Sequence, residues 1–162
     1  MTLLSDDRPR GTKGLSYRKV WSFKGSTKAF IAQQLAECSR PVVHVFCGAS
    51  RLGDVLVDLH HPAAGVKADA EKMPFKGLKT ILADPPWGAA LDVRARWMLG
   101  LTNALGPGGV LLLYAPWMPA SYGLRFEGAW LRHSNRWHFP EAPVMPTKWT
   151  RVVSRNSPKV TP

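Results

Sequence analysis

The sequence predicts a single α/β domain with a mostly parallel central sheet, a last antiparallel strand and helices on both faces. Short apolar segments alternate along the chain with segments whose apolar residues recur at helical spacing, which is typical of parallel sheets. Two weaker segments, near 129–139 and 147–154, are polar at alternate positions and predict antiparallel strands at the end of the sheet. We expect residues 1–16 to form a flexible basic tail and residues 17–162 to form the domain.

The first half of the chain predicts one helix and up to four strands. The helix follows Ser26, and its apolar side would hold Ala29, Phe30, Ala32, Leu35 and Ala36. The segment PVVHVFCG predicts a buried strand that ends in a turn. Val55–Leu59 predicts a second strand, Gly65–Ala68 is a candidate third, and Thr80–Ala83 predicts a strand that runs into an acidic, proline-rich turn.

The second half predicts a helix and then a fully apolar strand. Asp92 is placed to cap the helix, and Gly106-Pro107 ends it. One apolar face of this helix would hold Val93, Trp97, Met98, Leu101, Ala104 and Leu105, so we expect Trp97 in the core. The strand VLLLYAPW follows.

Three predicted strands end in unusual sequence. These ends are Cys47-Gly48-Ala49-Ser50, Asp84-Pro85-Pro86-Trp87 and Tyr114-Ala115-Pro116-Trp117. Ligands of parallel α/β sheets bind at the carboxyl ends of the strands, so we expect these turns to converge on one cleft.

The sharpest motif is Asp84-Pro85-Pro86-Trp87. Two successive prolines stiffen a loop and remove two backbone donors, so its carbonyl groups are free to accept hydrogen bonds. A planar group with an exocyclic amine could donate to the Asp84 carboxylate and the Pro85 carbonyl while its ring stacks on Trp87. An ordinary strand-ending turn is the alternative, because Asp-Pro often begins turns.

This motif resembles that of the amino methyltransferases of nucleic-acid bases, which are class I S-adenosylmethionine-dependent enzymes; the Asp-Pro-Pro-Trp form is typical of adenine-N6 enzymes. Other segments match in the same order. HVFCGASRLGD resembles the cofactor loop after the first strand, VKADAEKMPF the segment that meets the cofactor's adenine, and GPGGVLLLYAPW the fifth strand. The resemblance covers about residues 40–117 and implies a Rossmann-like methyltransferase fold.

The resemblance also implies a cofactor, S-adenosyl-L-methionine, and a set of site residues. Direct methyl transfer to an amine, most characteristically adenine N6, would be carried by Asp84, Pro85, Pro86 and Trp87. The cofactor would be bound by His44, Phe46, Cys47, Gly48, Ala49, Asp58, Asp69, Ala70 and Asp84. An aromatic residue and a lysine before the first strand, Phe23 and Lys28, would add to its pocket, although a capping helix with a solvated lysine explains them equally well.

The cofactor loop departs from the family pattern. It lacks the full G-x-G motif, and only Ala49–Asp54 separates the first strand from Val55–Leu59, whereas a parallel crossover usually needs about a dozen residues. Either the crossover helix is cut to a turn, so that Asp58 binds the ribose and Asp69 lies near the adenine, or Ser50–His61 is the helix and Asp69 takes the ribose role. We favour the first register, because VLVDL has the composition of a strand.

Basic charge is concentrated at the two ends of the chain. The net charge is +11, and residues 1–28 and 120–162 each carry seven basic and two acidic residues, whereas residues 29–119 carry eight and seven. This distribution favours a nucleic-acid partner, DNA or RNA, although basic ends could also serve solubility alone. The candidate contacts are Arg132, Arg136, Trp137, Lys148 and Arg151.

The remaining composition excludes several classes of protein. Two cysteines cannot form a disulfide framework, and the histidines lack metal-ligand spacing. We find no signal peptide and no membrane-length apolar run, so we expect a reducing, cytoplasmic setting without a membrane partner. The chain has little room for a target-recognition domain, which a homodimer or a partner subunit would supply. The competing function is a non-catalytic nucleic-acid-binding partner subunit with a methyltransferase fold.

Overall fold

The computed structural model describes residues 22–23, 25–85, 96–115, 122–130 and 145–152. Within these ranges one six-stranded sheet has the order β2–β1–β3–β4–β6–β5. Its strands are β1 (Val42–Val45), β2 (Val55–Val57), β3 (Leu78–Ala83), β4 (Leu105–Ala115), β5 (Leu124–Ala129) and β6 (Met145–Arg151).

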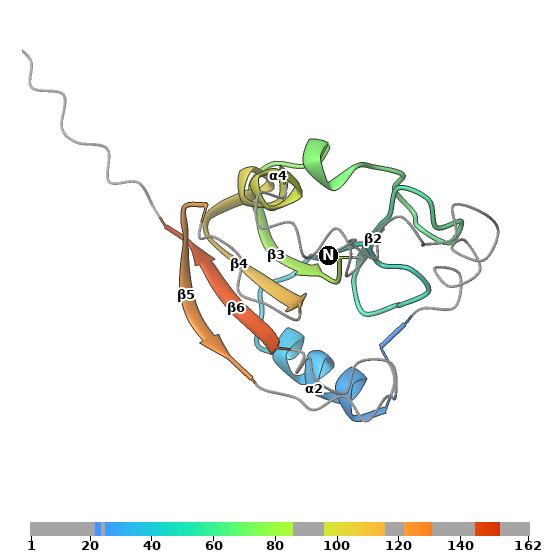
Figure 1. The fold of residues 1–162 in the computed structure, drawn as a ribbon, viewed down its shortest axis with the longest axis horizontal. Coiled ribbons are helices and arrows are strands. Elements are labelled where there is room, and N and C mark those ends of the chain that lie inside the picture. Colours follow the sequence, from blue (N-terminus) through green and yellow to red (C-terminus); the bar gives the residue numbers. More distant parts are fainter. Residues whose placement is uncertain (1–21, 24, 86–95, 116–121, 131–144, 153–162) are drawn as a thin grey trace, which may run out of the picture.

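Only β6 runs against the direction of the other strands. The strands β2, β1, β3 and β4 are parallel, and β6 is antiparallel to both of its neighbours, β4 and β5. The strand β5 therefore runs with the parallel set, although it is the outermost strand (Figure 1). The predicted last antiparallel strand is confirmed as β6. Of the strand expected near 129–139, residues 131–139 lie outside the described residues, and β5 ends at the start of that range.

Two helices cover opposite faces of the sheet, as predicted. In Figure 1, α4 (Arg96–Ala104) lies above the strands and α2 (Gly25–Ala36) lies below them. Successive strand residues point to opposite faces, so each strand contributes to two cores. Val43 and Ile81 pack in the core under α4, which includes the predicted core residue Trp97, and Leu82 packs in the core under α2.

The buried face of α2 differs from the predicted one. Ile31 and Leu35 face the sheet at 2% and 4% exposure, while Ala29, Ala32 and Ala36 are exposed. Ile31 and Leu35 are four residues apart and lie on one helix face. Burying two large aliphatic side chains removes more apolar area from water than burying three methyl groups, so the helix turns this face inward.

The crossover from β1 to β2 holds no helix, and β2 lies at Val55–Val57, which confirms the strand placement of the first register. It follows the sheet closely: a Cβ on Gly53 would lie 2.8 Å from the His44 Cβ, so only glycine fits there. The Asp54 amide donates to the Val42 carbonyl, and the Asp54 carboxylate accepts from the Val42 amide at 2.7 Å. The candidate third strand is reduced to one parallel bridge between Val57 and Val66.

A short 3₁₀ helix, η1 (Ala70–Lys72), packs directly against α4. A Cβ on Gly100 would lie 2.0 Å from the Ala70 carbonyl oxygen, so this contact requires glycine in α4. No helix among the described residues is both long enough and apolar enough to cross a membrane.

Candidate functional site

The candidate site lies at the carboxyl edge of the parallel strands, where β1 turns away from the sheet. Phe46 and Gly48 both have a positive φ, of 59° and 51°. The Ser50 amide closes this turn on the Cys47 carbonyl at 2.9 Å. Left-handed backbone is easy for glycine and uncommon for phenylalanine, so this turn is specified by the surrounding structure rather than by local preference.

Asp58, directly after β2, ties this glycine turn to the next loop. Its Oδ2 accepts a hydrogen bond from the Gly48 amide at 3.1 Å, and its Oδ1 accepts from the His60 and His61 amides at 2.8 and 2.9 Å. Burial alone would raise the pKa of Asp58, but these hydrogen bonds outweigh burial and hold the pKa below its ordinary value. The predicted cofactor residues Gly48 and Asp58 are thus in direct contact through a hydrogen bond to a charged carboxylate.

Asp84 lies at the same edge, directly after β3. Its side chain is 5% exposed and its amide donates to the Val45 carbonyl at 3.4 Å, so the start of the acidic motif lies beside the end of β1. Pro85 is also buried. Pro86 and Trp87 lie outside the described residues, as do Pro116 and Trp117 of the third predicted turn.

Two aromatic residues, Phe46 and Trp97, lie on the α4 side of the site. Phe46 is half-buried, and its ring meets the edge of Trp97 at a centroid distance of 5.7 Å. This contact joins a turn residue to a helix residue 51 positions later, so no local spacing in the sequence could have revealed it. Cys47 is buried beneath the same turn, and burial, with the nearby Asp58 charge, raises its pKa to about 11. Its thiol therefore stays protonated at neutral pH and is not a nucleophile.

Asp69 and Ala70 were both predicted to contact the cofactor, but they differ in exposure to solvent. Asp69 is exposed and caps η1, where its carboxylate accepts from the Glu71 amide at 2.9 Å. Ala70 is 3% exposed and belongs to the core under α4. Ala49, the last residue predicted in the glycine turn, is half-buried.

Three other predicted cofactor residues lie on the α2 side of the sheet. Phe23 is 5% exposed and stacks on the ring of His44, which is fully buried, while Lys28 is exposed on α2. Burial lowers the pKa of His44 to about 3, so its ring is neutral at pH 7, and neither ring nitrogen finds a hydrogen-bond partner among the residues that the structure describes. Phe23 also meets Tyr114 edge-on at 5.1 Å, so Phe23 and His44 form an aromatic core beneath β1.

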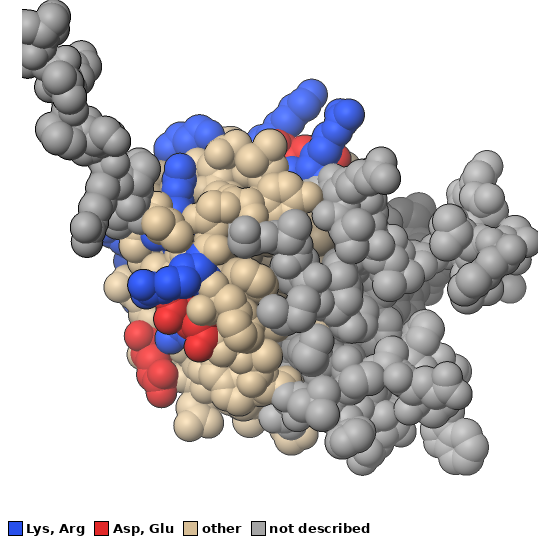
Figure 2. Space-filling model, turned by 60° about the vertical axis from the view of Figure 1, so that its left-hand side comes forward, with Lys and Arg blue, Asp and Glu red and all other residues tan. Residues whose placement is uncertain are grey.

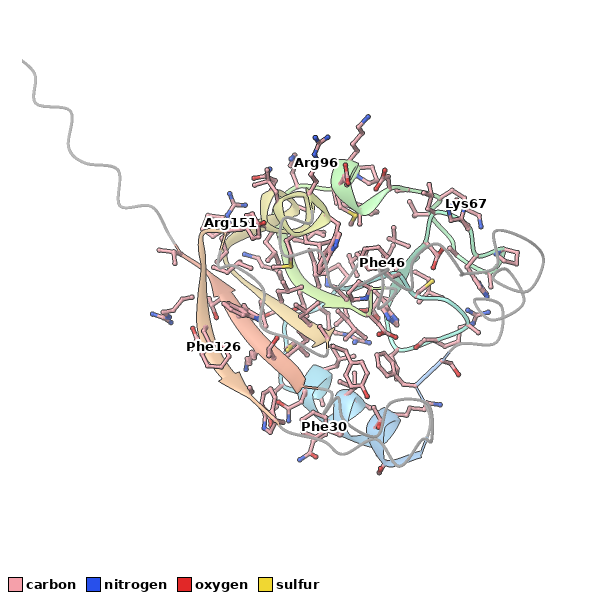
Figure 3. All side chains as sticks on the ribbon, viewed as in Figure 1. Phe30, Phe46, Lys67, Arg96, Phe126 and Arg151 are labelled. Atoms are coloured by element: carbon pink, nitrogen blue, oxygen red, sulfur yellow. The ribbon has the colours of Figure 1, made fainter. Side chains whose placement is uncertain are left out.

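The two described candidates for nucleic-acid contact do not share a surface. Trp149 is buried in the core under α4. Successive strand residues point to opposite faces, so Lys148 points to the α2 face, and Arg151, two residues after Trp149, points to the α4 face. The Arg151 guanidinium donates to the Leu105 carbonyl at the amino end of β4. In Figure 3, Arg151 lies on the β5–β6 side, away from Phe46. Arg132, Arg136 and Trp137 lie outside the described residues.

On the face shown in Figure 2, lysine and arginine side chains form separate groups, some beside acidic side chains. Ion pairs account for two of the arginines: Arg40 binds Asp54 at 2.7 Å and Arg125 binds Glu127 at 2.8 Å. Across the described ranges, no three His, Cys, Asp or Glu side chains gather as metal ligands.

Comparisons with known proteins bear on the fold. No protein-family model matches the chain, and no curated protein matches it. Among solved structures, it is similar to magnesium protoporphyrin IX methyltransferase from Synechocystis PCC 6803 with bound SAM, with a TM-score of 0.56, 10% identity and coverage of 86% of this chain and 92% of that one.

Two further structures have lower scores. One, described under the conversion of a disulfide bond into a thioacetal group during echinomycin biosynthesis, has a TM-score of 0.50, 15% identity and coverage of 76% and 82%. The other, the 16S rRNA (adenine(1408)-N(1))-methyltransferase W203A mutant from Catenulisporales acidiphilia, has a TM-score of 0.49, 16% identity and coverage of 85% and 96%. The protein has the Rossmann-like α/β fold of a methyltransferase.

Proposed function

We propose that this protein is an S-adenosyl-L-methionine-dependent methyltransferase that acts on an exocyclic base amine of DNA or RNA, at adenine N6. The observation that carries the proposal is the position of Asp84: a carboxylate buried at the carboxyl end of β3, beside the glycine turn that follows β1. A fold shared with methyltransferases does not by itself specify a substrate, so the proposal rests on this site.

The described residues fit the proposed cofactor. A carboxylate can accept about four hydrogen bonds, and Asp58 uses three of them for backbone amides, which leaves one acceptor position for a ribose hydroxyl. The turn at Gly48 lies beside it, and the half-buried Phe46 belongs to the same turn. When bound, the cofactor supplies an electrophilic methyl group. The solved structure of magnesium protoporphyrin IX methyltransferase contains the same cofactor on the same fold.

The role of this chain's own residues is to bind and orient the amine. The Asp84 carboxylate and the Pro85 carbonyl would accept its two protons in hydrogen bonds, which favours a tetrahedral nitrogen and offsets the positive charge that develops there. Trp87 would stack on the base. In this role Asp84 acts as a hydrogen-bond acceptor and not as a strong base.

A nucleic-acid substrate is supported by charge. The chain carries 22 basic and 11 acidic residues, and the excess lies at both ends. An acidic or neutral small substrate would not require this distribution, whereas a phosphate backbone is attracted by it. Its two free cysteines suit a cytoplasmic setting.

The test measures cofactor binding and product formation separately. Calorimetry with S-adenosyl-L-methionine reports binding, and mass spectrometry of DNA and RNA nucleosides after incubation with labelled cofactor identifies the methylated base. Asp84→Ala should lower the single-turnover rate by about 10²–10³ while the cofactor affinity stays nearly unchanged. A folded Asp84→Ala protein with the parental rate would remove this residue from the chemistry.

One observation favours a second function, that of a non-catalytic nucleic-acid-binding partner subunit. The crossover between β1 and β2 has no helix, so the glycine turn lacks the helix N-terminus that often neutralises anionic groups at this position of the fold. If calorimetry detects no cofactor binding while an oligonucleotide still binds, this second function is the correct one.

A further inference from the structure

We propose that the hollow between α2 and the β1–β2 crossover binds a nucleotide of the target strand next to the base that is methylated. This inference rests on the proposed function, because it assumes a nucleic-acid substrate. It adds a second contact surface, distinct from the carboxyl edge where Asp84 lies.

The hollow exists because the crossover is short. Residues 46–54 return along the sheet without a helix, and Gly53 packs on His44, so within the described ranges this crossover places no helix beside α2. The space left is open to solvent and has a volume of about 510 Å³. Its lining consists of Ala32, Leu35, Ala36, Cys38, Arg40, Arg51, Leu52 and Gly53. Ala32 and Ala36, predicted from the sequence to face the core, thus border this hollow instead.

The lining combines an apolar floor with a cationic rim. Methyl and isobutyl groups from α2 and Leu52 form the floor. At the rim, Arg40 is neutralised by Asp54 at 2.7 Å. Arg51 is exposed, and its one hydrogen bond to a described residue is at 3.4 Å, to the carbonyl of its neighbour Ser50. Of the two arginines that line the hollow, Arg51 is thus the one that forms no ion pair within the described part of the chain, and the charges of Lys148 and Glu37 act on the neighbouring Cys38. A guanidinium can bind a phosphate through two parallel hydrogen bonds, which suits Arg51 to a backbone phosphate.

Arg51 also links the hollow to the candidate site. It follows Ser50, whose amide closes the glycine turn on Cys47, and the charge of Arg51 acts on the Cys47 thiol. A strand with its target base near Asp84 could therefore place an adjacent phosphate on Arg51 and the attached sugar on the apolar floor. The lining residues include no aromatic ring and no side-chain amide, and Arg51 is assigned to a phosphate, so the hollow should bind dT and dA strands alike.

The experiment measures binding of fluorescein-labelled single-stranded 12-mers of dT and dA, and of a ribonucleotide 12-mer, by anisotropy over a range of salt. Arg51→Met removes the free charge of the hollow, and Arg125→Met is the matched control, because Arg125 is paired with Glu127 on the outermost strand. Ala32→Trp fills the hollow, and Ala29→Trp is its control, because Ala29 is exposed on the same helix but does not line the hollow. Far-UV circular dichroism checks the fold of every variant.

We expect Arg51→Met to raise Kd about 3–10-fold on all three oligonucleotides and to reduce the slope of log K against log salt by about 0.7, the value for one phosphate on a single strand. Ala32→Trp should raise Kd without changing the slope, Arg51→Lys should retain most of the slope, and both controls should bind like the parent. If the parent binds oligonucleotides but Arg51→Met and Ala32→Trp behave like their controls, the hollow is not a nucleotide site and the proposed function stands. If the parent binds none of the oligonucleotides, both the hollow and the nucleic-acid substrate are wrong.

Discussion

Asp58 should stabilise the folded protein as well as the candidate site, and Asp58→Asn tests this. The carboxylate accepts three backbone N–H bonds, two on Oδ1 and one on Oδ2. In the asparagine variant, Oδ1 can still accept from the His60 and His61 amides, but the side-chain NH₂ faces the Gly48 amide, which is also a donor. One bond to a charged acceptor is lost, and such a bond contributes about 1.5–3 kcal/mol. Water reaches this half-buried position, so we expect a loss near the lower value.

The pH dependence gives a second, independent signature. The pKa of Asp58 in the folded protein lies below the ordinary value of 3.8, so the folded state prefers the charged form. The stability that Asp58 contributes is therefore fully present above the unfolded pKa and is lost as the pH falls through the folded pKa. The parent should lose more stability than Asp58→Asn when the pH falls below about 4.

Urea unfolding followed by circular dichroism, at pH 7 and at steps down to pH 3, measures both effects. Asp69→Asn is the control, because Asp69 is exposed and its carboxylate accepts a single amide bond, from Glu71. Equal unfolding free energies of parent and Asp58→Asn at pH 7, with parallel pH profiles, would refute the role of Asp58 as the link between the glycine turn and the loop after β2.

Three further predictions concern the core and the basic ends. His44 is neutral and buried with a pKa of about 3 against an ordinary 6.5, so the parent should lose about 2 kcal/mol of stability between pH 7 and pH 5, and His44→Leu should remove this loss in urea titrations at the two pH values. Gly100→Ala should cost about 2–3 kcal/mol in thermal or urea unfolding, because the new Cβ would meet the Ala70 carbonyl, whereas Gly128→Ala, with open space around it, should be nearly neutral. Deleting residues 1–16 removes three basic residues and should flatten the salt dependence of oligonucleotide binding; an unchanged slope would mean that this segment serves solubility alone.

The sequence by itself determined the layered fold and the place of the acidic motif. The apolar segments at β1, β3 and β4 are buried on both faces, so each reads as a nearly continuous apolar run that needs no partner to be recognised. The strands β1, β3 and β4 are parallel to one another, so the turns that follow β1 and β3 had to meet at one edge. The positions of the glycine turn and Asp84 were therefore predictable from order and spacing, whereas that of Asp58 depended on the choice between two registers.

Tertiary structure decided which faces and which partners these segments use. The burial of Ile31 and Leu35, rather than the alanines of α2, depends on how the helix lies on the sheet. The short crossover was recognisable from its length, but the close contact of Gly53 with β1, which opens the hollow beside α2, was not. Periodicity shows that one side of a helix is apolar, but not which apolar residues the neighbouring element can reach.

The position of β6 between β4 and β5 is the clearest case of a strand pairing that the sequence alone did not specify. Its composition predicted an antiparallel strand, yet its insertion places Lys148 and Arg151 on opposite faces and brings Arg151 to the Leu105 carbonyl. Likewise, the contact of Phe46 with Trp97 and the three amide bonds of Asp58 each join separate parts of the backbone. Local sequence encodes the burial and direction of an element through its own side chains, whereas pairing between distant segments depends on the packing of the whole chain, and only the folded structure contains it.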